Sequence, residues 1–173
     1  MWTPIPSWLG LLLATVAFMA VPVRAQTPTE AAELKAQVLL RVLLFVQWPP
    51  DRLGPRQAVE LCLLQDDGLG ASLLRQQGQA LGGRRLNVRR IAAAVPDPGC
   101  HAVYASTDLP PLPAGHGMLV VADHFGMIER GAMVNLHMEG GRPGFDVGLG
   151  ALRRARLDMS AKLLRLARYV KDE

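Results

Sequence analysis

The chain has 173 residues, of which 50% are hydrophobic and 20% charged, and 19 Lys and Arg stand against 15 Asp and Glu. This length suits one domain with a proper core, and no shift in composition marks an internal linker. The formal net charge of +4 is too small to indicate nucleic-acid binding, which calls for basic residues clustered with exposed aromatics.

The first feature along the chain is an apolar run without a charged side chain, WLGLLLATVAFMAV at 8–21. This run is shorter than the roughly 20 residues that span a bilayer, and it is typical of a secretory h-region. Small residues follow at Val23 and Ala25, the positions that a signal peptidase reads. We therefore expect residues 1–25 to be a signal peptide and 26–173 a single exported domain. No Lys or Arg precedes Trp8, so an uncleaved anchor stays open as the alternative.

Apolar residues at helical spacing predict a helix over 30–48, with Thr29 as its cap and Trp48-Pro49-Pro50 as its end. A buried strand is expected at 59–64, followed by a turn at 66–68 and a short helix over 69–78. Alternating apolar and basic residues at 86–91 indicate a strand with one face in water.

Short apolar runs predict two further strands, at 102–105 and 118–122. Residues 132–138 and 143–147, separated by a Gly-containing turn, predict an antiparallel hairpin. Helices are expected over 149–156 and 160–170, the second capped by Ser160 and buried through Leu163, Leu166, Ala167 and Val170. Together these elements predict an α/β fold: a mixed, mostly parallel sheet with helices on both faces and a C-terminal β-hairpin plus helices.

Cys62 and Cys100 are the two cysteines of the sequence. In an oxidising compartment an isolated pair is a reasonable disulfide candidate, and two buried free thiols are the alternative. A CxxC motif is absent from the sequence, so a thioredoxin-type oxidoreductase has no support.

Polar residues follow three of the expected strands: Asp66, Ser106 and Asp123. In open α/β sheets a ligand binds at the carboxyl ends of the strands, so these residues predict a ligand crevice. Turn chemistry also places Asp and Ser at such positions, which is the plain alternative.

Catalysis and metal binding have weak support in this sequence. A GxSxG nucleophile motif is absent, and His101, His116, His124 and His137 lack metal-site spacing. We expect a protein that is not an enzyme and holds no metal or cofactor; a hydrolase using Ser106 is the weakest rival. Basic residues on the first helix and near the C-terminus form a candidate partner surface, or else solvated helix faces: Arg41, Arg153, Arg154, Arg165 and Arg168.

Several segments, taken in order, resemble the YfiR-like periplasmic family. They include LLRVLLFVQWP at 39–49, the cysteine strand LCLL at 61–64 with Asp66 and Asp67, and CHAVYAS at 100–106. The resemblance continues through the segment that enters the hairpin, its return strand with Phe145 and Asp146, and the closing segment that begins at Ser160. It spans roughly 34–168.

Members of that family are small exported proteins that restrain a membrane-bound diguanylate cyclase. The resemblance implies a non-catalytic regulator whose partner is the periplasmic domain of such a cyclase, with a homodimer plausible and a redox input through the cysteines. The alternative is a periplasmic protein that binds or senses a small ligand in the Asp66/Ser106/Asp123 crevice.

Overall fold

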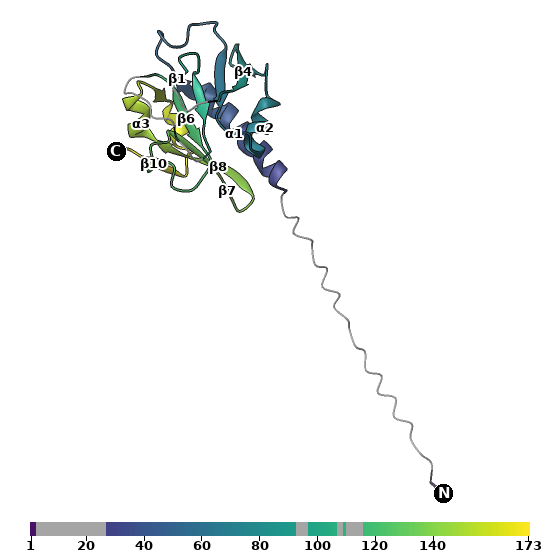
Figure 1. Ribbon diagram of the computed structural model, residues 1–173. Coiled ribbons are helices and arrows are strands. Elements are labelled where there is room, and N and C mark those ends of the chain that lie inside the picture. The colour runs from purple at the N-terminus through teal and green to yellow at the C-terminus, as the bar shows by residue number, and fades with distance from the viewer. Residues whose placement is uncertain (3–26, 93–96, 107–108, 110–115) are drawn as a thin grey trace.

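Figure 1 shows the computed structural model, which describes residues 1–2, 27–92, 97–106, 109 and 116–173. The expected signal peptide over 1–25 falls almost entirely outside the described residues. Within the described part, no helix is both long enough and apolar enough to cross a membrane.

The first helix, α1 (Pro28–Phe45), begins at a cap and ends where a strand takes over. The Thr27 hydroxyl accepts a hydrogen bond from the Glu30 amide at 3.2 Å, so the cap lies before the expected Thr29. The helix ends at Phe45, ahead of the tryptophan–proline segment, because β1 (Val46–Gln47) pairs antiparallel with β9 (Asp158–Met159). The prolines therefore follow a short strand and do not themselves end the helix.

The main sheet has eight strands in the order β10-β8-β7-β6-β5-β2-β4-β3. The five strands from β7 to β4 in this order run parallel. β3 is antiparallel to β4, β8 is antiparallel to β7, and β10 runs parallel to β8. This confirms the mixed, mostly parallel α/β sheet. Its strands are β2 (Val59–Leu63), β3 (Ala80–Leu81), β4 (Arg84–Arg90), β5 (Ala102–Tyr104), β6 (Leu119–Ala122), β7 (Val134–Glu139), β8 (Arg142–Gly148) and β10 (Tyr169–Lys171).

The C-terminal hairpin of β7 and β8 is the one that the sequence predicts. Gly140 and Gly141 form its turn with φ of 55° and 77°, values that favour glycine. On the strands, His137 lies opposite Gly144, where a Cβ atom would come within 2.5 Å of the His137 ring. Glycine at 144 thus makes room for the imidazole over the sheet.

The expected helix over 160–170 is wrong beyond its first turn. Ser160 does cap a helix, but α4 (Ala161–Leu164) is short, and the chain then joins the sheet as β10. Leu166 and Val170 are 70% and 37% exposed, so they do not form a buried helix face. The Arg168 amide donates to the Phe145 carbonyl at 3.0 Å, which draws the segment to the open edge of β8.

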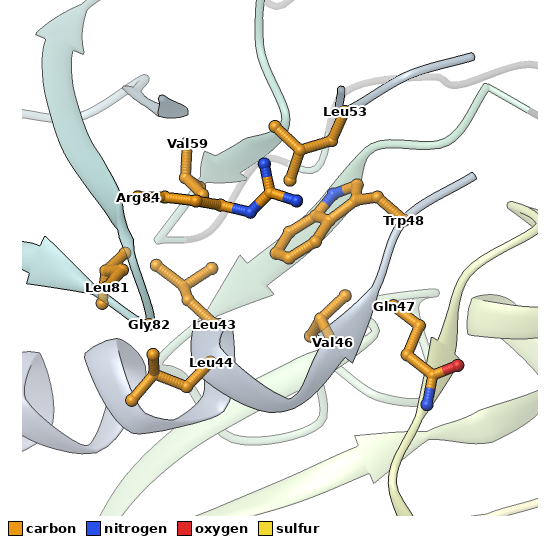
Figure 2. A pocket seen from close by; sticks show the side chains of 10 residues that line it. All are labelled: Leu43, Leu44, Val46, Gln47, Trp48, Leu53, Val59, Leu81, Gly82 and Arg84. Carbon is orange, nitrogen blue, oxygen red and sulfur yellow. The ribbon is translucent and has the colours of Figure 1, made fainter. Parts of the chain in front are cut away.

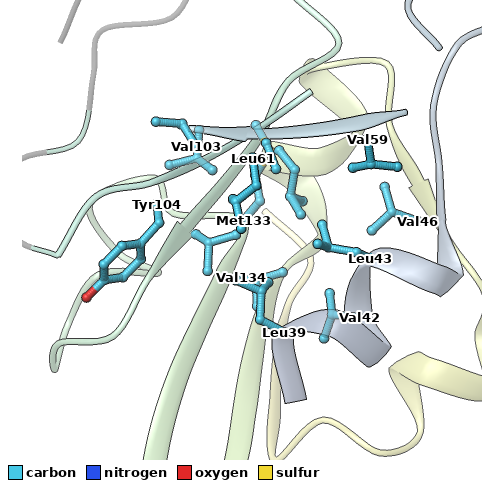
Figure 3. Packing of buried hydrophobic residues seen from close by; sticks show 14 of the residues in the cluster. Leu39, Val42, Leu43, Val46, Val59, Leu61, Val103, Tyr104, Met133 and Val134 are labelled. Atoms are coloured by element: carbon cyan, nitrogen blue, oxygen red, sulfur yellow. The ribbon is translucent and has the colours of Figure 1, made fainter. Parts of the chain in front are cut away.

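Helix α1 and the sheet enclose the core, as Figure 3 shows. Leu39 lies beside Val134, and Leu43 lies toward Val59 and Val46. Helix α2 (Gly68–Leu74) packs beside α1, whereas α3 (Leu149–Arg154) contacts β9 and β10. Each buried leucine contributes roughly 1.5–3 kcal/mol relative to an exposed one, so this helix–sheet contact carries much of the stability.

Cys62 and Cys100 form a disulfide with an Sγ–Sγ distance of 1.92 Å. Both side chains are fully buried, and the bond links β2 to the segment that leads into β5. Next to it, His101 accepts a hydrogen bond from the Glu60 amide at Nδ1, and its Nε2 faces the Arg52 carbonyl, each at 2.9 Å. Burial lowers the pKa of His101, and the neutral ring suits this pair of contacts.

We expect Cys62→Ser and Cys100→Ser each to lower the free energy of unfolding by about 3–4 kcal/mol. Each variant frees the 38-residue loop that the bond closes, which restores conformational entropy to the unfolded chain. Urea unfolding monitored by circular dichroism measures the difference.

The double variant is the control, because either single change already removes the whole bond. Its free energy of unfolding should match that of the single variants. The wild type, when it is unfolded in urea that contains a reductant, should show the same lowered free energy of unfolding. Unchanged stability in all three cases would contradict a stabilising bond.

Candidate functional site: a carboxylate cluster at the strand ends

The parallel strands β2, β5 and β6 lie side by side, and their carboxyl ends meet at one edge of the sheet. The structure brings two of the three expected crevice residues together there. The Ser106 hydroxyl donates to Asp123 Oδ1 at 3.1 Å. Asp66 lies apart: it is exposed and pairs with Arg90 at 2.9 Å.

Three further side chains complete what we call the carboxylate cluster, defined as Lys35, Asp67, Tyr104, Ser106 and Asp123. Lys35 Nζ lies 2.6 Å from Asp123 Oδ2. The Tyr104 hydroxyl lies 2.7 Å from Asp67 Oδ2 and 2.9 Å from Asp123 Oδ1, and its one hydrogen can serve only one carboxylate at a time. The cluster thereby joins α1, the start of α2 and the ends of β5 and β6.

Charge and burial shift the pKa values in this cluster. Burial of Asp123 raises the pKa of its carboxyl, but the Lys35 ammonium and hydrogen bonds from Tyr104 and Ser106 outweigh burial and hold that pKa below its usual value. Burial, the Asp123 charge and the hydrogen bond to Asp67 raise the pKa of Tyr104. Asp123 is thus ionised and Tyr104 is neutral at physiological pH.

The turn after β2 reaches the carboxylate cluster through Asp67, whereas the expected Asp66 pairs with Arg90. Asp67 accepts a hydrogen bond from the Gly70 amide at 2.7 Å as the cap of α2, and this contact turns its side chain inward. Lys35 and Tyr104 were missed. The available signals were a lysine within a wide apolar helix arc and a tyrosine within a buried strand, since a buried phenol needs a hydrogen-bond partner.

The contacts of His124 do not form a catalytic relay. Its Nδ1 lies 3.0 Å from Ser106 Oγ and 3.2 Å from Asp123 Oδ1. A serine–histidine–aspartate triad needs one ring nitrogen at the serine and the other at the aspartate, whereas here a single nitrogen faces both. Among the described residues, no group of three or more His, Cys, Asp or Glu side chains is arranged to hold a metal ion.

A separate pocket of about 410 Å³ lies on the side of β7 and β8. Phe125, Ile128 and Tyr169 supply its apolar lining, and Asp146 and Asn135 supply polar groups. Asn135 is only 5% exposed, and its Oδ1 has no hydrogen-bond partner in the described part of the chain. Arg168 closes one side through two hydrogen bonds to Asp146, at 2.9 and 2.6 Å.

A second pocket, of about 240 Å³, lies at the end of α1 (Figure 2). The Trp48 indole and the Arg84 guanidinium face one another in it, with Leu43 and Leu44 below them. Trp48 Nε1 donates to the His101 carbonyl at 3.1 Å, which fixes the ring. Leu44 is 46% exposed at the rim.

The basic residues expected to form a partner surface do not share one C-terminal helix. Arg153 and Arg154 lie on α3, Arg165 follows α4, and Arg168 precedes β10. Arg153 pairs with Asp172 at 2.5 Å, and Arg168 is held by Asp146. Arg41 is exposed on α1. Their role in partner binding stays a prediction, as does the ligand role of Asp66, Ser106 and Asp123.

The protein is therefore a mixed α/β domain with one disulfide, in which polar side chains at the strand ends are hydrogen-bonded to one another. The sequence model of the YfiR/HmsC-like family matches residues 32–168 of the chain, from α1 to the segment before β10. The chain belongs to this family.

We expect Lys35→Met to lower the free energy of unfolding by about 2–3 kcal/mol at pH 7, because it leaves the largely buried Asp123 carboxylate without its ammonium partner. In the wild type the lowered pKa of Asp123 contributes stability that is lost as pH falls through that pKa. In the variant, burial dominates and raises the pKa of Asp123, so this carboxyl becomes neutral on mild acidification. The difference in the free energy of unfolding between variant and wild type should therefore shrink between pH 7 and about pH 4. Urea unfolding at both pH values measures it.

Lys162→Met is the matched control, because Lys162 is exposed and lies in none of the ion pairs found among the described residues. It should change stability by less than about 0.5 kcal/mol at either pH. A Lys35→Met deficit that grows on acidification would contradict this account of the cluster.

Proposed function

We propose that the protein is an exported, non-catalytic regulator that binds the periplasmic domain of an inner-membrane diguanylate cyclase and holds the enzyme inactive. The family match over residues 32–168 carries this proposal, because it covers nearly the whole described domain. The leader over 1–25 would direct export as a signal peptide, with 26–173 as the mature domain. Release of the cyclase would raise cyclic di-GMP and favour biofilm.

Inhibition requires the protein to bind the inactive form of the cyclase more tightly than the active form, since equal affinity would shift nothing. Arg41, Arg153, Arg154 and Arg165 are exposed and are the proposed contacts, together with Arg168. A homodimer of this protein would present two such surfaces. Substitution of these exposed arginines should mainly lower the rate at which the protein associates with the cyclase.

The disulfide is the proposed redox input. Because both sulfurs are fully buried, a reductant reaches the bond only after local opening of the β2–β5 region. Once the bond is reduced, the smaller population of folded domain lowers the apparent affinity for the partner by the same fraction. The protein would therefore respond to sustained rather than brief reducing conditions.

We expect Cys62→Ser to raise cyclic di-GMP in cells that carry the partner cyclase, because less folded regulator is present to restrain the enzyme. Cyclic di-GMP extracted from cells with the wild type, the variant and a gene deletion measures the effect. A pull-down from membranes, with the exported domain as bait, identifies the cyclase.

The Lys162→Met variant should behave as the wild type in the same cells. Equal cyclic di-GMP levels in wild-type and deletion cells would rule out control of a cyclase, whatever the cysteine variants do. Equal levels in wild-type and Cys62→Ser cells, with the deletion still elevated, would discard the redox input alone.

A second candidate function is small-ligand sensing, which the pocket of about 410 Å³ favours. The unpartnered Asn135 Oδ1 is suited to accept a hydrogen bond from an N–H or O–H of a ligand whose apolar part contacts Phe125 and Tyr169.

We expect a thermal-shift screen of periplasmic metabolites to give ligands whose effect on Tm disappears in Asn135→Leu. That change removes the acceptor at similar volume, so its own unliganded Tm is the reference for each shift. Ligands that act equally on the variant would place binding elsewhere.

A further inference from the structure

A shallow groove of about 510 Å³ lies beside the turn between β3 and β4. Three arginines line it, Arg56, Arg84 and Arg85, together with Gly78, Ala80 and Gly83. At Gly78 and Gly83 nothing lies within 4 Å of the position that a Cβ would take. No side chain therefore fills the space above these two glycines. We call this surface the arginine groove.

Arg84 fixes the geometry of the arginine groove. Its guanidinium Nη1 donates to the carbonyls of Gly54 and Gln57, the latter at 3.2 Å. These two carbonyls flank Arg56 in the chain, so the contacts hold the loop that carries Arg56 against β4, which carries Arg85. The positive charges are brought together before any ligand arrives.

Three arginines on the neighbouring elements have carboxylate partners. Arg75 pairs with Glu33, Arg89 with Asp97, and Arg90 with Asp66. By contrast, Arg56, Arg84 and Arg85 take part in none of the ion pairs within 4 Å that join described residues. Arg56 and Arg85 are also exposed. Guanidinium groups in this state attract phosphate and other oxyanions, which they bind through paired N–H donors.

The exposed apolar side chain of Leu44 borders the same turn, and the exposed Phe45 follows it at the end of α1. Leu44 Cδ2 lies only 3.2 Å from the position of a Cβ at Gly82, and Leu44 and Phe45 are 46% and 39% exposed. Arg41 lies one helical turn before them on α1 and is also exposed. Figure 2 shows Leu44, Gly82 and Arg84 around one pocket. Because Arg84 also lines the arginine groove, the exposed Leu44 and the groove meet at this residue.

We propose that this surface docks on the anionic phospholipid headgroups of a membrane. Headgroup phosphates would occupy the arginine groove, while Leu44 and Phe45 would enter the boundary between headgroups and acyl chains. A free phosphate would engage the arginines alone and would leave the two apolar side chains in water. This inference deepens the proposed function and rests on it, because a regulator held at the bilayer meets a membrane-bound partner more often.

Sedimentation with lipid vesicles tests the proposal without any cyclase. Protein purified from periplasmic extracts is mixed with vesicles of phosphatidylcholine containing about a third phosphatidylglycerol, or of phosphatidylcholine alone. We expect binding to the anionic vesicles that weakens with salt. Arg56→Gln with Arg85→Gln should weaken it about 25-fold, since each arginine near an anionic surface contributes roughly fivefold.

Arg130→Gln with Arg142→Gln is the matched control, because it removes the same charge from two exposed arginines on other elements. It should retain most of the vesicle binding. Equal losses in the two double variants would overturn the proposal in favour of a non-specific charge effect, and so would equal binding to both kinds of vesicle. Displacement by millimolar inorganic phosphate at constant ionic strength would assign the groove to free phosphate instead. None of these outcomes bears on cyclic di-GMP control, which is measured separately in cells.

Discussion

Burial of α1 against the parallel sheet is the constraint on which the other features depend. The helix contributes Leu39, Val42 and Leu43 to the core. It also places Lys35 at the carboxyl ends of the strands and Leu44 at the turn between β3 and β4. Because side chains four residues apart lie on one helix face, a rotation of α1 that exposed the core residues would also remove Lys35 from Asp123. The hydrophobic contact and the ion pair therefore hold the same orientation.

Much of the fold follows from local patterns in the sequence. Alternation in β4, apolar runs in β2, β5 and β6, and the Gly140–Gly141 turn each point to the element found. The two-residue strands β1, β3 and β9 could not be anticipated, because they exist through pairing with distant residues. The segment around Val170 shows the same limit: its helical period is real, but the open edge of β8 supplies backbone partners that override local propensity.

The candidate site was predictable to the level of the sheet edge, but not to the level of the atoms. Parallel strands bring Ser106 and Asp123 to one edge, and that inference needed only strand order. The choice between Asp66 and Asp67 depends on which of the two caps α2, and that is a property of the folded turn. The pocket with Asn135 and the arginine groove depend on loops from separate parts of the chain, so neither leaves a contiguous mark in the sequence.

The complete burial of both cysteines has a consequence for how the molecule matures. An oxidant or a disulfide-exchange catalyst must touch a thiolate, and a sulfur without exposed surface offers no point of attack. Oxidation of the two thiols has to happen while β2 and the segment before β5 are still accessible, before the domain closes around them. A copy that collapsed too early would seal its thiols inside and would have to reopen before the link could form. Folding and oxidation of this domain therefore compete, and an oxidant acts most readily on a chain that has not yet closed around its thiols.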